Sequence, residues 1–333
     1  MTHIITKPVP WKNDDWQYHL KNAVTNCSEL ARLTGLDEGD LDWDENPSFD
    51  LRVPKTYIKK MKFGDPTDPL LLQVAPRKVE SAIVDGFIDD PLNEIEASKS
   101  PGLIKKYEER ALVITAAACA VNCRYCFRRH FPYENHRNNF ESQTLTAIAN
   151  DSSIKEAILS GGDPLIMTDS SLIRLMQNIT DIPHVRRLRI HTRLPVVIPS
   201  RVTNRLLNYF SALNCPLIIV LHFNHANEIG SDTKAALSSL ASTGATLLNQ
   251  SVLLRGVNDN PETLASLSES LFHTGVLPYY LHLLDPVTGT SHFDIEKEEA
   301  SRIFSSLQEV LPGYLVPRLV REVAGEKAKQ LEK

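Results

Sequence analysis

The sequence predicts an α/β fold, in which a parallel sheet curls into a partial (β/α)6-type barrel preceded by a mostly helical extension. Three observations predict it: six short apolar runs, helical patterns between them, and a polar cluster at the end of each run. At 333 residues the chain is long enough for one barrel-sized domain with an appendage. A doubly wound open sheet is the main alternative from the pattern alone.

The expected strands span residues 111–119, 156–162, 186–193, 216–223, 246–254 and 277–285. Helical patterns lie between them at 169–180, 200–213 and 260–275. Asp169 is a candidate N-cap, and Gly275 is placed to end the last helix. The apolar strands fit a sheet that is covered on both faces.

The first hundred residues have a different pattern. Residues 14–35 show helical periodicity, whereas 51–61 and 69–81 are shorter and are broken by prolines. We therefore expect a mostly helical extension over 1–100 and a barrel over 101–333, which includes the C-terminal segment.

Composition narrows the class of protein. The hydrophobic content of 42% and charged content of 23% are typical of a soluble globular protein. A net charge of −5 and a pI near 6.1 argue against a nucleic-acid partner. No run approaches the ~18 apolar residues of a membrane span, and the N-terminus lacks a signal-peptide pattern. We therefore expect no membrane association. Because the cysteines are few and unevenly spaced, we also expect a reducing compartment and a cytoplasmic location.

Polar clusters end all six expected strands: "CAVNCRYC", "SGGDP", "HTR", "HFNH", "NQS" and "LLD". Each alone fits ordinary turn chemistry. Because the carboxyl ends of barrel strands share one rim, six clusters in register predict an active site there.

The first cluster places Cys119, Cys123 and Cys126 in a C-x3-C-x2-C spacing. A zinc site would need a fourth ligand, which only Cys215 or His130 could supply. A redox C-x2-C pair would leave Cys119 unexplained. A [4Fe–4S] cluster held by three thiolates would leave one iron open to a further ligand.

This cysteine spacing after the first barrel strand, followed by the glycine pair of "SGGDP", resembles the radical S-adenosylmethionine superfamily. Stretches such as "PGLIKKYEERALVITAAACAVNCRYCFRRHF", "RIHTRLPVVIPSR" and "LLNQSVLLRGVND" narrow the resemblance. Over roughly 85–330 the chain is similar to the lysine 2,3-aminomutase family. Its closest likeness is to the branch that makes (R)-β-lysine for elongation factor P.

The resemblance implies three cofactors: a [4Fe–4S] cluster on the three cysteines, S-adenosylmethionine, and pyridoxal 5′-phosphate. It places further cofactor contacts at Gly161, Gly162, Asp163, His222 and Gln250. Catabolic members of the family bind zinc through extra C-terminal cysteines. This chain ends at Lys333 without them, so we expect no zinc.

The resemblance also implies a catalytic lysine that forms a Schiff base with pyridoxal phosphate. Lys329 follows Glu322 by the family's seven-residue step, although most of the family's glycines are missing and Lys327 is a nearby competitor. Read without the resemblance, this stretch is a charged tail. The family's phosphate-binding stretch matches "KYEER", which nominates Lys106, Tyr107 and Arg110.

Substrate contacts follow from charge. A carboxylate suits a bidentate guanidinium, and Arg128 matches the family's arginine. A desolvated ammonium needs opposite charge, and Asp285 and Glu322 match the family's two acidic positions. This pair of acids predicts L-lysine as the substrate.

The activity implied is L-lysine 2,3-aminomutase: (S)-α-lysine becomes (R)-β-lysine by a radical derived from S-adenosylmethionine, acting on lysine joined to pyridoxal phosphate. The implied partners are elongation factor P and its lysyl-ligating enzyme, through a functional link. Two other classes stay open: a free-standing metabolic aminomutase for lysine or another amino acid, and a degenerate iron–sulfur protein. The sequence also leaves open whether the lysine is free or protein-attached, and whether the chain forms a homo-oligomer.

Overall fold

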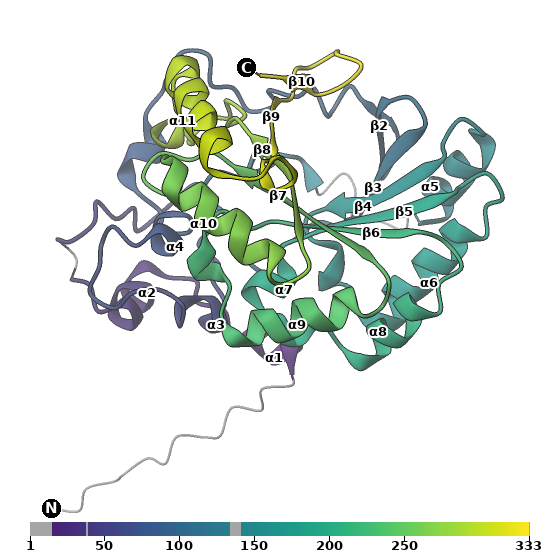
Figure 1. The fold of residues 1–333 in the computed structure, drawn as a ribbon, viewed down its shortest axis with the longest axis horizontal. Helices are drawn as coiled ribbons and strands as arrows, with labels where there is room; N and C mark the ends of the chain where they lie inside the picture. Colours follow the sequence, from purple (N-terminus) through teal and green to yellow (C-terminus); the bar gives the residue numbers. More distant parts are fainter. Residues whose placement is uncertain (1–14, 38, 134–140, 333) are drawn as a thin grey trace, which may run out of the picture.

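The computed structural model describes residues 15–37, 39–133 and 141–332 (Figure 1). The helices are α1 Trp16–Lys21, α2 Cys27–Thr34, α3 Lys55–Ile58, α4 Pro69–Leu72, α5 Glu141–Asn150, α6 Asp169–Thr180, α7 Leu194–Val197, α8 Asn204–Ser211, α9 Ser231–Ala241, α10 Pro261–Phe272 and α11 Lys297–Val310. The strands are β1 Ser98–Ser100, β2 Leu103–Tyr107, β3 Arg110–Ala116, β4 Glu156–Gly161, β5 Arg187–Thr192, β6 Leu217–Leu221, β7 Thr246–Val252, β8 Leu277–His282, β9 Arg318–Arg321 and β10 Gln330–Leu331. Short 3-10 turns include η1 Lys78–Ser81, η3 Pro164–Ile166, η4 Pro199–Arg201, η5 Ala226–Glu228, η6 Ser291–Phe293 and η7 Gly313–Leu315. In the described ranges no helix is long and apolar enough to cross a membrane.

The described strands form one sheet whose spatial order follows the sequence from β1 to β10. Neighbours from β3 to β9 are parallel, whereas β1–β2–β3 and β9–β10 are antiparallel. A doubly wound sheet reverses its order at a switch point, and this sheet does not. Sequential right-handed crossovers put the helices on one face and let the sheet curl. The partial barrel is therefore confirmed, with β1 and β10 as its two edges.

The six expected strands correspond to β3 through β8, each within a few residues of the expected bounds. The helices α6, α8 and α10 were also expected. The N-cap of α6 is Thr168 rather than Asp169, since the Thr168 hydroxyl accepts from the backbone N–H of Ser171. Gly275 takes a positive φ of 78° just beyond α10, as a helix terminator does.

The two faces of the sheet differ, which corrects the expectation that both are covered. Burial alternates along β3, β5 and β7, with every second residue only half-buried. On β5, Leu188 and Ile190 pack outward into the apolar core, while Arg189 and His191 occupy the inner face. The hydrophobic core thus lies between the sheet and its helices. The concave face carries polar side chains.

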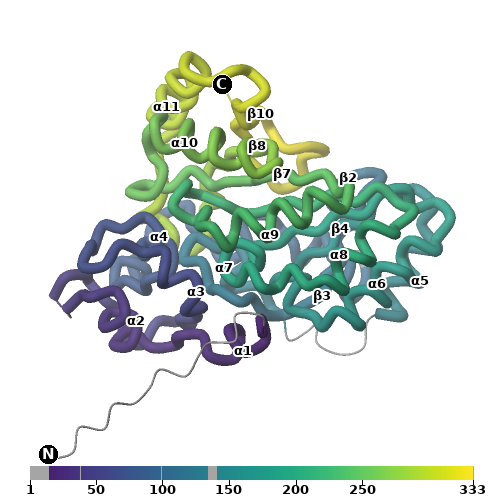
Figure 2. Tube along the Cα trace, turned by 60° about the horizontal axis from the view of Figure 1, so that its bottom comes forward, coloured from purple at the N-terminus to yellow at the C-terminus, as the bar shows by residue number. Residues whose placement is uncertain are grey.

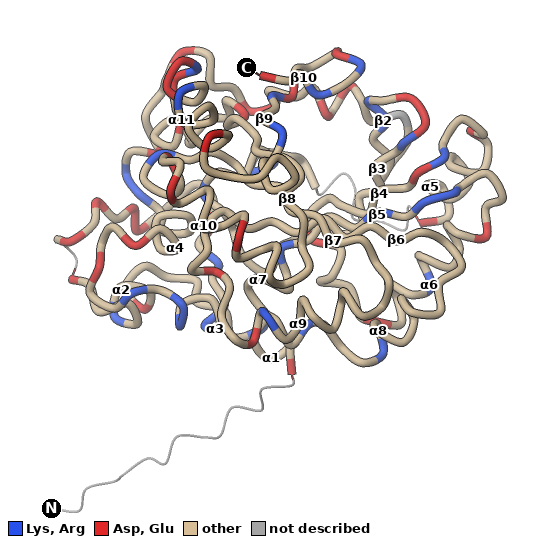
Figure 3. Tube along the Cα trace, in the orientation of Figure 1, with Lys and Arg blue, Asp and Glu red and all other residues tan. Residues whose placement is uncertain are grey.

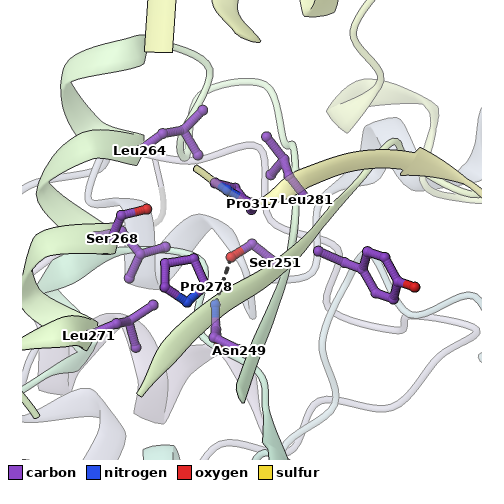
Figure 4. A pocket seen from close by; sticks show the side chains of 10 residues that line it. Asn249, Ser251, Leu264, Ser268, Leu271, Pro278, Leu281 and Pro317 are labelled. Carbon is purple, nitrogen blue, oxygen red and sulfur yellow. Dashed lines mark hydrogen bonds between the residues drawn. The ribbon is translucent and has the colours of Figure 1, made fainter. Parts of the chain in front are cut away.

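A small cavity on the outer side of the barrel illustrates this alternation (Figure 4). It lies where α10 packs on β7 and β8, and its volume of about 10 Å³ has room for about one water. Asn249 and Ser251 face it and are joined by a 2.9 Å hydrogen bond. Gln250 lies between them in sequence and therefore points to the opposite, inner face.

Residues 15–97 are less helical than the sequence predicted. Four short helices and η1 are joined by irregular segments, because prolines at 47, 54, 66, 69 and 76 lack the N–H that a continuing helix needs. Figure 2 shows this part against the side of the barrel that carries α7 and α9. Tyr57 donates to Glu228 Oε1 at 2.8 Å, and Lys60 donates to Val196 O at 2.7 Å. One apolar cluster runs from Trp16 through the barrel strands, so the extension shares the barrel's core.

Candidate active site

The loop after β3 carries the three clustered cysteines, and the N-terminal part of the chain holds this loop. The backbone N–H of Asn122 donates to Arg52 O at 3.0 Å, and that of Arg124 donates to Gln73 O at 2.9 Å. The buried Arg124 side chain donates to Glu80 Oε1 at 2.8 Å. The loop is therefore fixed by backbone and side-chain bonds to residues far away in the sequence.

The cysteine thiols lie close enough to perturb one another. Burial, and then the neighbouring Cys123, raise the pKa of Cys126 to about 11. Burial, and then Cys126 and Asp163, hold the pKa of Cys119 well above its usual value. Arg193 Nη1 donates to Cys123 Sγ at 2.8 Å, which places a fixed positive charge beside the thiol group.

This donor set fits an iron–sulfur cluster better than a single metal ion. Among the described residues, no group of three or more His, Cys, Asp or Glu side chains converges on one ion position. A [4Fe–4S] cluster takes its thiolates on different irons, so its ligands need not meet at one point. Nearby guanidinium groups favour the thiolate form that ligation requires.

The glycine pair at the end of β4 packs directly on the start of the cysteine loop. A Cβ on Gly162 would stand 2.2 Å from Ala118 O, a distance that no side chain tolerates. Gly161 has a φ of 110°, and the N–H of Gly162 donates to Ala116 O at 2.8 Å. The glycines are thus required for the close approach of two backbones, independently of any ligand.

Asp163 belongs to the frame of the site. Its buried carboxylate accepts from Thr192 Oγ1 at 2.7 Å and from the backbone N–H groups of Leu165, Arg193 and Leu194 at 2.7–3.0 Å. These bonds satisfy both oxygens, so the carboxylate of Asp163 ties the end of β4 to the end of β5.

Histidines line the inner face of the barrel. Burial, and then Arg193, lower the pKa of His222 to about 3, so its imidazole is neutral. His191 on β5 and His282 on β8 also have pKa values held well below the usual range by burial. In the described residues their Nε2 atoms are buried without a hydrogen-bond partner, as expected where a polar group binds. The sequence analysis nominated neither of them, although His191 lies in its polar cluster "HTR" and His282 directly precedes its cluster "LLD".

The C-terminal segment brings Lys329 to the same face. Lys329 Nζ is ion-paired with Glu322 Oε2 and lies 5.9 Å from the centre of the Tyr280 ring. Glu322 Oε1 accepts from Lys106 Nζ at 2.9 Å. Burial alone would raise the pKa of Glu322, but Lys329 and Lys106 hold it well below its usual value. Lys327 is exposed and forms no ion pair with the described residues.

The three residues expected at the phosphate group differ in how far acidic side chains already contact them. The Arg110 guanidinium stacks over the Tyr107 ring at 4.4 Å and has no carboxylate partner in the part of the chain that the structure describes. Tyr107 contacts Glu322. Lys106, in contrast, is already held by two acids, Glu94 at 3.1 Å and Glu322.

Asp285 follows β8 and faces the same charges. No hydrogen bond or ion pair of its carboxylate is formed with the described residues. Burial, and then the negative charge of Glu322, raise the pKa of Asp285 to about 7, although Lys329 and Lys106 oppose the shift. A carboxylate with this environment would be stabilised by an incoming cation.

Arg128 is buried and is already paired. Its Nε donates to Glu94 Oε2 at 2.6 Å, and its Nη2 donates to Glu94 Oε1 at 2.8 Å. Sequence reasoning missed Glu94, which lies before the barrel in a segment with no motif.

These pairs join the two open edges of the barrel. Lys106 lies on β2, next to one edge, and Glu322 follows β9, next to the other. Acidic and basic residues both occur near these edges (Figure 3). Arg128, Glu94, Lys106, Glu322 and Lys329 form a line of alternating charge across the opening.

Comparison with known proteins places the site in a family. Residues 109–187, which include the cysteine loop, match the model of a 4Fe-4S single cluster domain. The L-lysine 2,3-aminomutase of Escherichia coli K12 is 47% identical over 334 residues, covering 99% of this chain and 97% of the relative. That of Haemophilus influenzae is 46% identical over 98% of this chain and 97% of the relative. That of Clostridium subterminale is 32% identical over 94% of this chain and 76% of the relative.

Solved structures give weaker likenesses. Streptococcus suis SuiB bound to its precursor peptide SuiA has a TM-score of 0.47 at 11% identity, covering 65% of this chain and 48% of SuiB. A radical SAM methyltransferase from Sphaerobacter thermophilus has a TM-score of 0.45 at 15% identity, covering 67% of this chain and 71% of that one. The family assignment rests on the sequence relatives.

The open barrel, the three-cysteine loop and the polar inner face define a radical S-adenosylmethionine enzyme. At 46–47% identity over nearly its whole length, the chain belongs to the lysine 2,3-aminomutase family, and it is an isomerase. The family's cofactors are a [4Fe–4S] cluster, S-adenosylmethionine and pyridoxal 5′-phosphate. The thiols, the unpartnered inner-face nitrogens, and Lys329 with Arg110 and Tyr107 supply suitable donors for each.

Proposed function

We propose that this chain converts (S)-α-lysine into (R)-β-lysine and that the product is used to modify elongation factor P. The observation that carries the lysine assignment is Asp285, a half-buried carboxylate without a cationic partner among the described residues. A side-chain ammonium offsets its charge, whereas the side chain of alanine or glutamate does not.

Bound cluster and S-adenosylmethionine supply radical chemistry, and pyridoxal phosphate supplies the carbonyl that carries the amine. The protein supplies charge and position. Cys119, Cys123 and Cys126 hold the cluster, and His222 and Gln250 present polar groups beside it on the inner face.

Lys329 is the residue that joins pyridoxal phosphate. Its ion pair with Glu322 keeps the amine on the inner face until the cofactor arrives, and Glu322 then remains paired with Lys106. Arg110 and Tyr107 bind the phosphate, since the Arg110 guanidinium is not committed to a carboxylate as Lys106 is. The Tyr107 hydroxyl exchanges its contact with Glu322 for the phosphate.

The direct test is anaerobic incubation of the reconstituted protein with L-lysine, S-adenosylmethionine, pyridoxal phosphate and reductant, followed by chiral amino-acid analysis. The expected product is (R)-β-lysine. Cys123→Ala protein is the matched control, and it should lack both the cluster and the product. Turnover of alanine or glutamate in place of lysine would contradict the assignment.

The link to elongation factor P rests on the likeness of the sequence to that branch of the family. Elongation factor P from cells that lack this gene should lose the mass of one β-lysyl group, and added (R)-β-lysine should restore it. An unchanged mass would favour a free-standing metabolic role.

A further inference from the structure

Glu94 is a buried acid of the site and has no role in the assignments above. It lies between α4 and β1, with only 3% of its surface exposed. Its backbone N–H donates to Asp90 Oδ1 at 3.0 Å, which fixes the local turn. Its carboxylate touches two cations, Arg128 and Lys106.

The Arg128 guanidinium has five N–H donors, and its contacts within the protein already use four of them. The Nε and Nη2 groups donate to the two oxygens of Glu94 at 2.6 and 2.8 Å, so Glu94 occupies the side-on edge. Nη1 donates to Ser160 Oγ and to Gly161 O, both at 3.2 Å. A substrate carboxylate therefore has access only to the Nη1–Nη2 edge, where it replaces the longer contacts.

Lys106 shares the carboxylate. Its Nζ lies 3.1 Å from Glu94 Oε1 and 2.9 Å from Glu322 Oε1. One acid thus links the cation expected at the substrate carboxylate to the charges around Lys329. A buried guanidinium that lost this partner would be uncompensated, and its rotation would no longer be fixed.

We propose that Glu94 is a positioning residue, which holds the Arg128 guanidinium side-on so that its Nη1–Nη2 edge receives the α-carboxylate of the substrate. The inference rests on the proposed function, because it takes an amino acid as the ligand. Through Arg128, Glu94 favours the binding of amino acids over that of amines, although its own side chain contacts neither ligand.

The test compares two ligands that differ only in the carboxylate. L-Lysine and 1,5-diaminopentane are titrated into protein loaded with cluster and pyridoxal phosphate, without S-adenosylmethionine, so that no turnover occurs. Absorbance of the bound pyridoxal phosphate reports the Kd. Glu94→Gln should raise the Kd for lysine at least tenfold and change the Kd for the diamine less than twofold. Glu96→Gln, an exposed acid two residues away, is the matched control and should change neither.

Two results would overturn the role of Glu94: an unchanged Kd for lysine, or equal weakening of both ligands, which would mean that Glu94 only supports the general shape of the site. If Glu94→Gln does not fold, Glu94→Asp keeps the charge but shortens the reach, and it should show the same difference between the ligands. If unaltered protein gives no spectral response to lysine, the proposed function fails. If unaltered protein responds to lysine normally but the Glu94 variant gives one of these two results, only the inference about Glu94 fails.

Discussion

Asp285 and Glu322 are the two acids expected to bind the substrate ammonium, yet their surroundings differ. Glu322 is neutralised by Lys106 and Lys329. Asp285 has no such partner in the described chain, and its pKa is raised to about 7. At the residue scale, Asp285 is therefore the acid that an added cation stabilises more.

Asp285→Asn should weaken lysine binding strongly, because the ammonium would be desolvated without a counter-charge. Losing one partner of a buried charge pair costs about 3–5 kcal/mol. With ~1.4 kcal/mol per factor of ten, we expect a loss of roughly a hundredfold or more. The Kd for lysine, measured by pyridoxal phosphate absorbance, tests this, and the Kd for the cofactor itself is the control. Unchanged lysine affinity would make the acid structural.

Lysine affinity should also depend on pH through Asp285. Below its pKa of about 7 the carboxyl is protonated and neutral, so binding of the ammonium must release a proton. Affinity should therefore rise with pH up to about 7 and level off above it, because the lysine ammonium itself stays charged to about pH 10. Titrations between about pH 5.5 and 8.5 measure this. Asp285→Asn should flatten the profile, and a rise that persists in that variant would contradict the assignment.

Lys329 and Lys327 can be separated by chemical trapping. Lys329 faces Glu322 and Tyr280, whereas Lys327 is exposed. Borohydride should fix pyridoxal phosphate on Lys329, as peptide mass spectrometry would show. Lys329→Ala should lose the Schiff-base absorbance, and Lys327→Ala should keep it. A label on Lys327 would show that the register from Glu322 is wrong by two residues.

At the scale of elements, the end of β4 and the start of the cysteine loop form one unit. The N–H groups of Gly162 and Asp163 donate to Ala116 O and Ala118 O. Asp163 then joins this unit to the end of β5 through Thr192 and Arg193. The loop that carries the cysteines is thus positioned by two neighbouring strands.

Gly162→Ala should separate these backbones. The new Cβ would lie 2.2 Å from Ala118 O, so the loop must move. Overpacking of this kind costs about 1–3 kcal/mol. We expect a lower Tm and a lower iron content after reconstitution. Gly313→Ala, where a Cβ meets nothing within 4 Å, is the control. Full iron content in Gly162→Ala would show that the loop tolerates the shift.

At the scale of the whole molecule, Glu228 connects the N-terminal extension to the barrel. Its buried carboxylate accepts from Tyr57 Oη at 2.8 Å in the extension and from Arg193 Nη2 at 2.6 Å in the barrel. Arg193 in turn contacts Cys123. The extension therefore supports the site through two buried charges.

Glu228→Gln should destabilise the protein as a whole. The substitution leaves Arg193 buried without a counter-charge, which costs about 3–5 kcal/mol. The midpoint of urea unfolding should fall, and the cluster should be lost at lower urea concentrations. Glu309→Gln, an exposed acid on α11, is the control and should change neither. A shift below about 1 kcal/mol would show that water compensates Arg193.

The sequence alone determined the strands β3 to β8, the helices α6, α8 and α10 and the family of the chain. These depend on local periodicity and on short spacings such as those of Cys119, Cys123 and Cys126, which the order of residues contains directly. The short strands β1, β2, β9 and β10 at the two ends of the sheet were missed, because their few residues carry no period and are stabilised by pairing partners.

Only the tertiary structure decided which charges meet. Glu94 on Arg128, Lys106 on Glu322 across the open side, and Asp163 on the end of β5 join residues that are 29 to 216 positions apart. Such pairs depend on how far the sheet curls and on which edge of a guanidinium is covered. Those quantities arise from packing over the whole barrel, which no local spacing encodes.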